Sequence, residues 1–148
     1  MSAKFKVNIK QQSKSWVVIT LSQKYNLFII EASEIACNPV GDLISAVENS
    51  GIYNHPAQVV FDAEGNLYRL KFELDSNGII TRGYFVEHHR SIEKPNNSEY
   101  RETLEFEVFC EKNEFIKSYW RGLKSYFNEE NLNSDELLVI EKAVIGKS

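Results

Sequence analysis

Residues 57–88 read AQVVFDAEGNLYRLKFELDSNGIITRGYFVEH, and this stretch decides the fold. Its two joints, AEGN and DSNG, place glycine beside Asn, Asp or Glu, which is the chemistry that supplies positive φ in tight hairpin turns. Between the joints, every second residue from Tyr68 to Leu74 is apolar and its neighbours are charged, as in a strand with one buried face. The pattern predicts neighbouring antiparallel strands at Ala57–Asp62, Asn66–Leu74 and Ile79–His88.

A fourth strand of this group is expected after a polar stretch. Residues 89–101 offer almost nothing apolar to bury, so we expect a mobile loop or a long hairpin tip there. The strand that follows alternates again, and its polar face is expected to carry cross-strand pairs of opposite charge. It is expected at Glu102–Cys110, with Leu104, Phe106, Val108 and Cys110 on the apolar face and Thr103, Glu105, Glu107 and Phe109 on the other.

Upstream of this region, three apolar runs separated by polar joints predict a meander. The first alternates strictly, so one of its faces is expected to be wet. The second and third, WVVITL and LFII, are apolar on both faces, which is typical of central strands covered on both sides. The three strands are expected at Lys4–Ile9, Trp16–Leu21 and Tyr25–Glu31.

Helix signals stand at three places. Asn38 as N-cap and Pro39 at the first helical position begin a helix that Gly51, in the left-handed conformation, is expected to end. In a second helix, Gly122 costs about 1 kcal/mol against alanine but permits close approach of another backbone. Ser134 is the expected N-cap of the third, in which LLVI equally fits a short strand. The helices are expected at Pro39–Ser50, Glu114–Phe127 and Ser134–Ile145.

Length and composition fit one domain. The chain has 148 residues, of which 43% are hydrophobic and 26% charged, and no repeat or linker divides it. The elements above come as runs of strands and separate helices, which is typical of an α+β protein. We therefore expect a single α+β domain over residues 1–148, with a mainly antiparallel sheet of about six to seven strands and two to three helices packed on it.

Charge and hydropathy narrow the classes of partner. The formal net charge is −4, and the 17 Lys and Arg residues are scattered along the sequence, whereas nucleic-acid binding needs a cluster of cations. No apolar run approaches the length of a membrane span, and the N-terminus has no signal-peptide core. The sequence thus favours a cytoplasmic protein that binds neither nucleic acid nor membrane, and its mild acidity suits a basic protein partner.

The residues that most often carry chemistry give no reactive cluster. Cys37 and Cys110 lack CxxC spacing, so two free thiols are favoured over a bridge. His88 and His89 are adjacent, and adjacent strand residues point to opposite faces, so they cannot both hold one ion while the strand continues. Because phosphate-loop, dinucleotide, nucleophile-elbow and metalloprotease motifs are also missing, we expect no cofactor, no metal and no catalytic residue.

The best remaining candidates are aromatic and acidic residues of the last strand. Tyr100 and Phe109 fall on or beside its polar face, close to Glu105 and Glu107. An exposed aromatic ring among carboxylates suits the binding of a basic partner. These four residues are the predicted partner-binding surface.

The layout resembles the small immunity proteins, and allied domains, that accompany bacterial polymorphic toxins and contact-dependent inhibition systems. The resemblance lies in IIEASEIACNPVGDLISAVENSG leading to AQVVFDAEGNLYRLKFEL, and in the closing helix FIKSYWRGLKSYF. It covers most of the chain without a diagnostic motif, so it assigns no residue a role. It implies a non-enzymatic inhibitor that binds and neutralises a cognate toxin.

Two other interpretations stay open. One is an enzyme or small-ligand-binding protein whose pocket lies between the sheet and the first helix, using His88 or His89 with a carboxylate. The other is an oligomerising module in which an edge strand such as Lys4–Ile9 pairs with a second chain.

Overall fold

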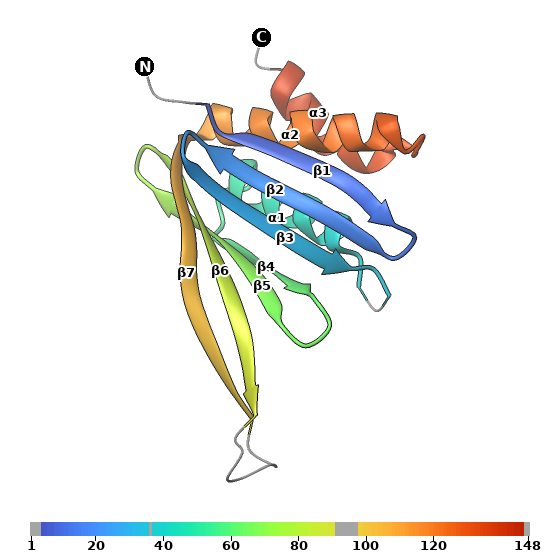
Figure 1. Cartoon of the computed structure of the whole chain (residues 1–148). Helices are drawn as coiled ribbons and strands as arrows, with labels where there is room; N and C mark the ends of the chain where they lie inside the picture. Colours follow the sequence, from blue (N-terminus) through green and yellow to red (C-terminus); the bar gives the residue numbers. More distant parts are fainter. Residues whose placement is uncertain (1–3, 36, 91–97, 147–148) are drawn as a thin grey trace.

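The computed structural model describes residues 4–35, 37–90 and 98–146, with the backbone alone at residues 88–90, 98 and 99. The expected α+β architecture is confirmed, with seven strands and three α-helices in this part of the chain (Figure 1). In chain order the elements are β1 (Lys6–Ser13), β2 (Trp16–Gln23), β3 (Asn26–Ser33), α1 (Pro39–Gly51), β4 (Ala57–Asp62), β5 (Leu67–Asp75), β6 (Gly78–Arg90), β7 (Ser98–Glu111), α2 (Lys112–Glu129), a 3₁₀ turn (Ser134–Leu137) and α3 (Leu138–Ile145).

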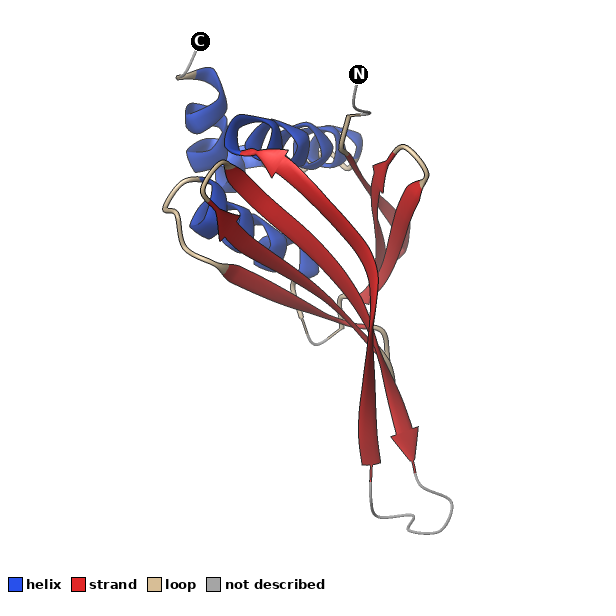
Figure 2. Cartoon of the chain, turned by 90° about the vertical axis from the view of Figure 1, so that its left-hand side faces the viewer, coloured by secondary structure: helices blue, strands red, loops and turns tan. Residues whose placement is uncertain are grey.

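The strands form two antiparallel sheets, where a single sheet was expected. Their orders are β1-β2-β3 and β4-β5-β6-β7, so every strand pairs only with neighbours in sequence. The chain leaves the first sheet through α1, and β3 and β4 do not pair. One connected core nevertheless draws buried side chains from both sheets and from the helices. Figure 2 shows the helices gathered on one side of the molecule and the β6–β7 hairpin extending away from them.

The first sheet shows why its third strand was misread. Strand β2 is central, and Val17, Ile19 and Leu21 on its inner face are fully buried. Strand β3 is an edge strand, and its second apolar face is also left uncovered: Leu27 is 57% and Ile29 46% exposed. The expectation that LFII is covered on both sides is therefore wrong, since a run that is apolar on both faces can also mark an exposed surface.

Helix α1 begins as predicted and ends differently. The Asn38 side-chain oxygen accepts a hydrogen bond from the Gly41 backbone N–H at 3.1 Å, and Pro39 follows at the first position. Gly51, however, lies within the last helical turn and has no positive φ. A Cβ there would lie 2.7 Å from Cγ1 of Ile116, so Gly51 allows α1 to approach α2.

Helix α2 runs beside β1, and the predicted role of Gly122 is confirmed. A Cβ at this position would lie 2.5 Å from the Val7 carbonyl oxygen, so only glycine lets helix and strand come this close. Farther along the same seam, the Tyr126 hydroxyl donates to the side-chain oxygen of Gln11 at 2.8 Å. Helix α2 thus packs against β1, the strand that we expected to pair with a second chain.

Strands β6 and β7 are longer than expected, and a bulge in β7 moves some of its side chains to the other face of the sheet. Much of the segment predicted as a loop is strand, up to Arg90 and again from Ser98, and the middle of that segment lies outside the described residues. A β-bulge then shifts the register, because Gly83 pairs with Phe106 while Tyr84 pairs with Leu104. Glu105 is the extra residue, so the alternation predicted for β7 breaks there and Leu104 lies on the outer face.

The C-terminal region also departs slightly from expectation. Asn133, rather than Ser134, is the N-cap, since its side-chain oxygen accepts from the Asp135 N–H at 3.0 Å. The region predicted as one helix is divided into a 3₁₀ turn and the short helix α3. Leu137 and Ile140 are its fully buried anchors.

Candidate functional site

Charged side chains on the outer face of the second sheet neutralise one another. Arg82 Nε donates to Glu107 Oε2 at 2.6 Å, and Arg82 also pairs with Glu73 on the opposite neighbouring strand. These two carboxylates raise the pKa of the Arg82 guanidinium. Arg69 pairs with Glu102 at 2.7 Å. The predicted cross-strand pairs are thus confirmed, and they leave this face little net charge for a basic partner.

The four predicted partner-binding residues do not converge on one spot. Tyr100 and Phe109 are exposed on β7, but the strand rises about 30 Å between them at ~3.3 Å per residue. Glu107 lies between them and is paired with Arg82. Glu105 is separated from this row by the bulge and borders a different feature.

That feature is a recess where the first sheet meets the second. It encloses about 350 Å³. Phe28 of β3 forms its base: its ring lies 5.8 Å from the Tyr68 ring, edge to face, and 6.1 Å from the Phe106 ring, stacked. Gly83 makes this contact possible, because a Cβ there would lie 2.6 Å from the Phe28 ring. The lining residues are Leu27, Phe28, Ile29, Tyr68, Phe85 and Glu105.

The recess has a negative charge, because Glu105 lines it and Glu31 on β3 lies near enough to act on Tyr68. Burial raises the pKa of the Tyr68 hydroxyl, and the charges of Glu31 and Glu105 raise it further, which places both carboxylates within electrostatic reach of the same phenol. Glu31 and Glu105 make no ion pair with any Lys or Arg among the described side chains. Their charge is therefore available to a ligand.

The recess also opens along the free edge of β3. Leu27, Phe28 and Ile29 are consecutive and point alternately to the two faces of the sheet, yet all three line it. Because side chains from both faces of β3 line the recess, the recess borders the backbone edge of this strand. The main-chain N–H and C=O groups on that edge can pair with an extended segment. Tyr25, 91% exposed in the preceding turn, extends the apolar surface beside it.

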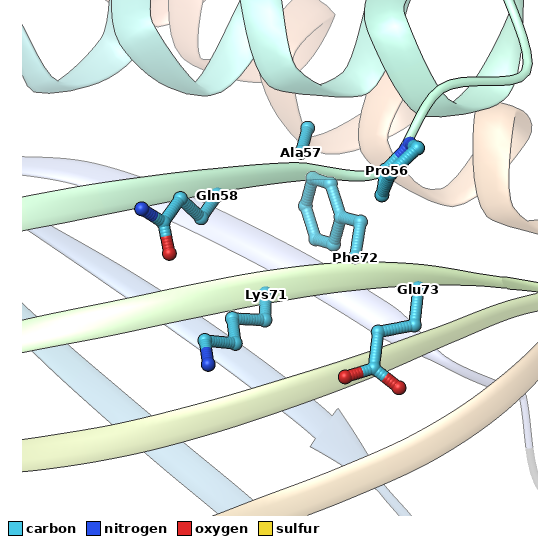
Figure 3. A pocket seen from close by; sticks show the side chains of 6 residues that line it. All are labelled: Pro56, Ala57, Gln58, Lys71, Phe72 and Glu73. Carbon is cyan, nitrogen blue, oxygen red and sulfur yellow. The ribbon is translucent and has the colours of Figure 1, made fainter.

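Two further hollows flank β4, the edge strand of the second sheet. One, of about 320 Å³, lies between α1 and β4, where the alternative interpretation expected a pocket. No described His or Cys side chain lines it: α1 contributes Asp42, Ser45, Ala46 and Asn49. The other lies over β4 and β5, with Gln58, Lys71 and Glu73 directed to one side and Phe72 to the other (Figure 3). The side chains of His88 and His89 lie outside the described residues, so their predicted role is untested.

The two cysteines are free thiols with opposite surroundings. Cys37 is exposed, whereas Cys110 is buried in the core. Burial raises the pKa of the Cys110 thiol to about 12, and the charge of Glu114 adds to this effect. A raised pKa keeps a thiol protonated, so Cys110 is a poor nucleophile near neutral pH.

We expect one thiol per native chain to react with 5,5′-dithiobis(2-nitrobenzoate) at pH 8, and two after unfolding. Cys37 is the reactive one because it is exposed, and Cys110 stays protected by burial and by its raised pKa. Absorbance of the released thiolate counts the groups directly. Cys37→Ser is the matched control, which should show no fast reaction. Two fast thiols in the native protein would contradict the burial of Cys110.

Two kinds of feature are not found among the described residues. No three His, Cys, Asp or Glu side chains in this part of the chain are placed to hold a metal ion together. None of its helices is long and apolar enough to cross a membrane.

The apolar recess beside β3 is therefore the best-defined candidate site, and most of its residues were missed from sequence. Glu105 is the one predicted residue that lines it. Comparison with protein-family models, with curated proteins and with solved structures gave no match.

Proposed function

We propose that this chain is a non-enzymatic protein-binding module that engages its partner through the recess beside β3. The observation that carries the proposal is the combination of exposed Leu27 and Ile29, an aromatic base, and two carboxylates without a cation partner among the described residues. Apolar anchors surrounded by a polar rim are the usual composition of a protein interface.

The chemistry of the recess defines the partner's surface. Its apolar base suits one or two apolar side chains on an extended segment, which would also pair with the free edge of β3. Glu31 and Glu105 suit Lys or Arg residues flanking those side chains. The partner we propose is therefore a basic protein with an apolar strand or loop.

A toxin domain is the partner to test first. The resemblance to immunity proteins implies a cognate toxin, and the negative charge of the recess supports a partner with a basic cleft. If a secreted protein with a variable C-terminal domain is encoded next to this chain, co-expression of that domain with this chain should restore the growth of cells that the domain alone inhibits.

The binding test compares two aspartate substitutions on edge strands. A partner captured at low salt is purified and titrated against Ile29→Asp, which places a charge in the recess, and against Val60→Asp on β4. These residues are matched in exposure, at 46% and 43%. We expect Ile29→Asp to weaken binding at least about 30-fold, the loss typical of an interface hot spot, and Val60→Asp to have little effect.

A double substitution tests the charge of the recess. Glu31→Gln with Glu105→Gln should slow association and reduce its dependence on salt, because the carboxylates steer a basic partner. Variants that bind the partner more weakly should also protect growth less. The proposal fails if no stoichiometric partner is captured, or if the captured partner binds Ile29→Asp as tightly as the unsubstituted chain.

A further inference from the structure

Another hollow lies at the β1 side of the first sheet, whereas the recess lies at its β3 side, and three cations border it. It encloses about 310 Å³ between the segment before β1 and the first half of α2. Lys4 comes from the segment, and Lys117 and Arg121 come from the helix. Asn113, Glu114, Ser118 and Phe5 complete its lining. Its volume is at the lower end of the range for small-molecule sites.

The side chains of these three cations have no partner among the described residues, although several cations elsewhere do. Arg69, Arg82 and Lys124 pair with carboxylates, and Lys112 donates to the Asn54 side-chain oxygen at 2.6 Å. The side chains of Lys4, Lys117 and Arg121 make no hydrogen bond or ion pair with any described residue. The sequence shows its cations scattered, whereas the packing of α2 beside β1 brings these three to one hollow.

Contacts between the N-terminal segment and α2 place Lys4 beside the helix that carries the other two cations. Glu114 Oε1 accepts from the Phe5 backbone N–H at 3.5 Å, and the Phe5 ring lies 5.5 Å from the ring of Tyr119. These contacts fix the segment that carries Lys4 against α2. Lys117 and Arg121 are four residues apart on one helix face, where Cβ atoms are about 6 Å from each other and like charges are unfavourable. An anion between them would relieve that repulsion.

We propose that this hollow binds the phosphate groups of a small anionic ligand. Three cations and the Glu114 carboxylate give it a net charge of about +2 in a chain whose formal net charge is −4. Arg121 supplies the planar fork that pairs with phosphate oxygens, and the two lysines supply point charges. Ser118, almost fully buried, brings a hydroxyl to the same lining.

Pyrophosphate and inorganic phosphate are the soluble probes, and calorimetry of the full chain at low ionic strength is the measurement. We expect pyrophosphate to bind with a dissociation constant below about 1 mM, more tightly than phosphate, and with an affinity that falls as salt is added. Lys117→Gln and Arg121→Gln should each weaken pyrophosphate binding about tenfold, because each removes a charge-assisted contact. Vesicles with and without phosphatidylserine form the third arm, which separates a soluble phosphate from a lipid headgroup.

Two variants make the test specific. Glu114→Gln removes the carboxylate of the hollow and should tighten pyrophosphate binding several-fold. Lys14→Gln, in the exposed turn at the far end of β1, removes the same charge away from the hollow and should change nothing. The proposal is overturned by no detectable heat with about 10 mM pyrophosphate, by equal losses in Lys14→Gln and Lys117→Gln, or by binding confined to the anionic vesicles. None of these results bears on the recess beside β3.

Discussion

Replacing Phe28 with alanine is expected to lower the free energy of unfolding by about 3–5 kcal/mol, the range for truncating a buried aromatic side chain. The ring is almost fully buried, and it contacts Tyr68 and Phe106 of the second sheet from a strand of the first. Its loss would leave a cavity where the two sheets meet. Urea unfolding followed by circular dichroism measures the change, and Phe109→Ala, at a half-exposed position, should cost far less.

A double-mutant cycle shows whether Phe28 acts through the second sheet. Gly83→Ala alone should destabilise by about 1–3 kcal/mol because its Cβ would overlap the Phe28 ring. In a Phe28→Leu background, a milder truncation than alanine, the same substitution has more room and should cost less. We expect a coupling free energy above about 0.5 kcal/mol. Strictly additive effects would contradict the contact between ring and glycine.

The second large effect is expected at Gly122. Alanine is the better helix former by about 1 kcal/mol, yet Gly122→Ala should lower the free energy of unfolding by about 2 kcal/mol. The added Cβ would lie 2.5 Å from the Val7 carbonyl oxygen, and backbone on both sides cannot move aside as a flexible side chain can. Thermal and urea unfolding of the variant give the sign directly.

Ser125→Ala is the matched control for this substitution. It lies on the exposed side of the same helix, so it gains helix propensity without a clash and should stabilise slightly. If Gly122→Ala were as stable as Ser125→Ala, helix α2 would not pack on β1 as closely as the structure has it.

Local chemistry was the most predictable part of the fold. The AEGN joint forms a tight turn with positive φ at Glu64 and Gly65, and Asn38 caps α1. The DSNG joint is also a tight turn, but without positive φ at residues 76–78. Gly78 serves a different purpose there, because a Cβ would lie 2.1 Å from the Cys110 carbonyl oxygen on β7. Sequence thus located the turn and missed why it contains glycine.

Long-range packing was the least predictable part. Whether β3 pairs with β4 in one sheet depends on where α1 places the start of β4. No local sequence pattern shows that the two sheets are separate. The bulge at Glu105 also leaves no signal in the sequence. Apolar and polar residues alternate without a break through this position, although the structure has one extra residue there. It moves Leu104 to the outer face and separates Glu105 from Glu107, which were expected to share one face.

The candidate site was only partly accessible from sequence for the same reason. The predicted surface joined Tyr100, Glu105, Glu107 and Phe109 because they are close in sequence, but only Glu105 lies at the recess. The signal that could have found the recess is LFII, whose apolar residues exceed what one buried face needs. Its second wall, Tyr68 and Phe85, comes from strands that no sequence pattern places beside β3.

The seam between β1 and α2 sets the order in which the chain can acquire its core during synthesis. Tyr126 and Gln11, which meet there, are 115 positions apart, whereas strands β1 to β3 pair only with sequence neighbours. At about 5–20 residues per second, a ribosome makes the first meander roughly 6–20 s before it makes the helix that covers it. During that interval the nascent chain exposes the apolar face of the β1–β3 sheet. Exposed apolar surface of this kind is what molecular chaperones protect from aggregation.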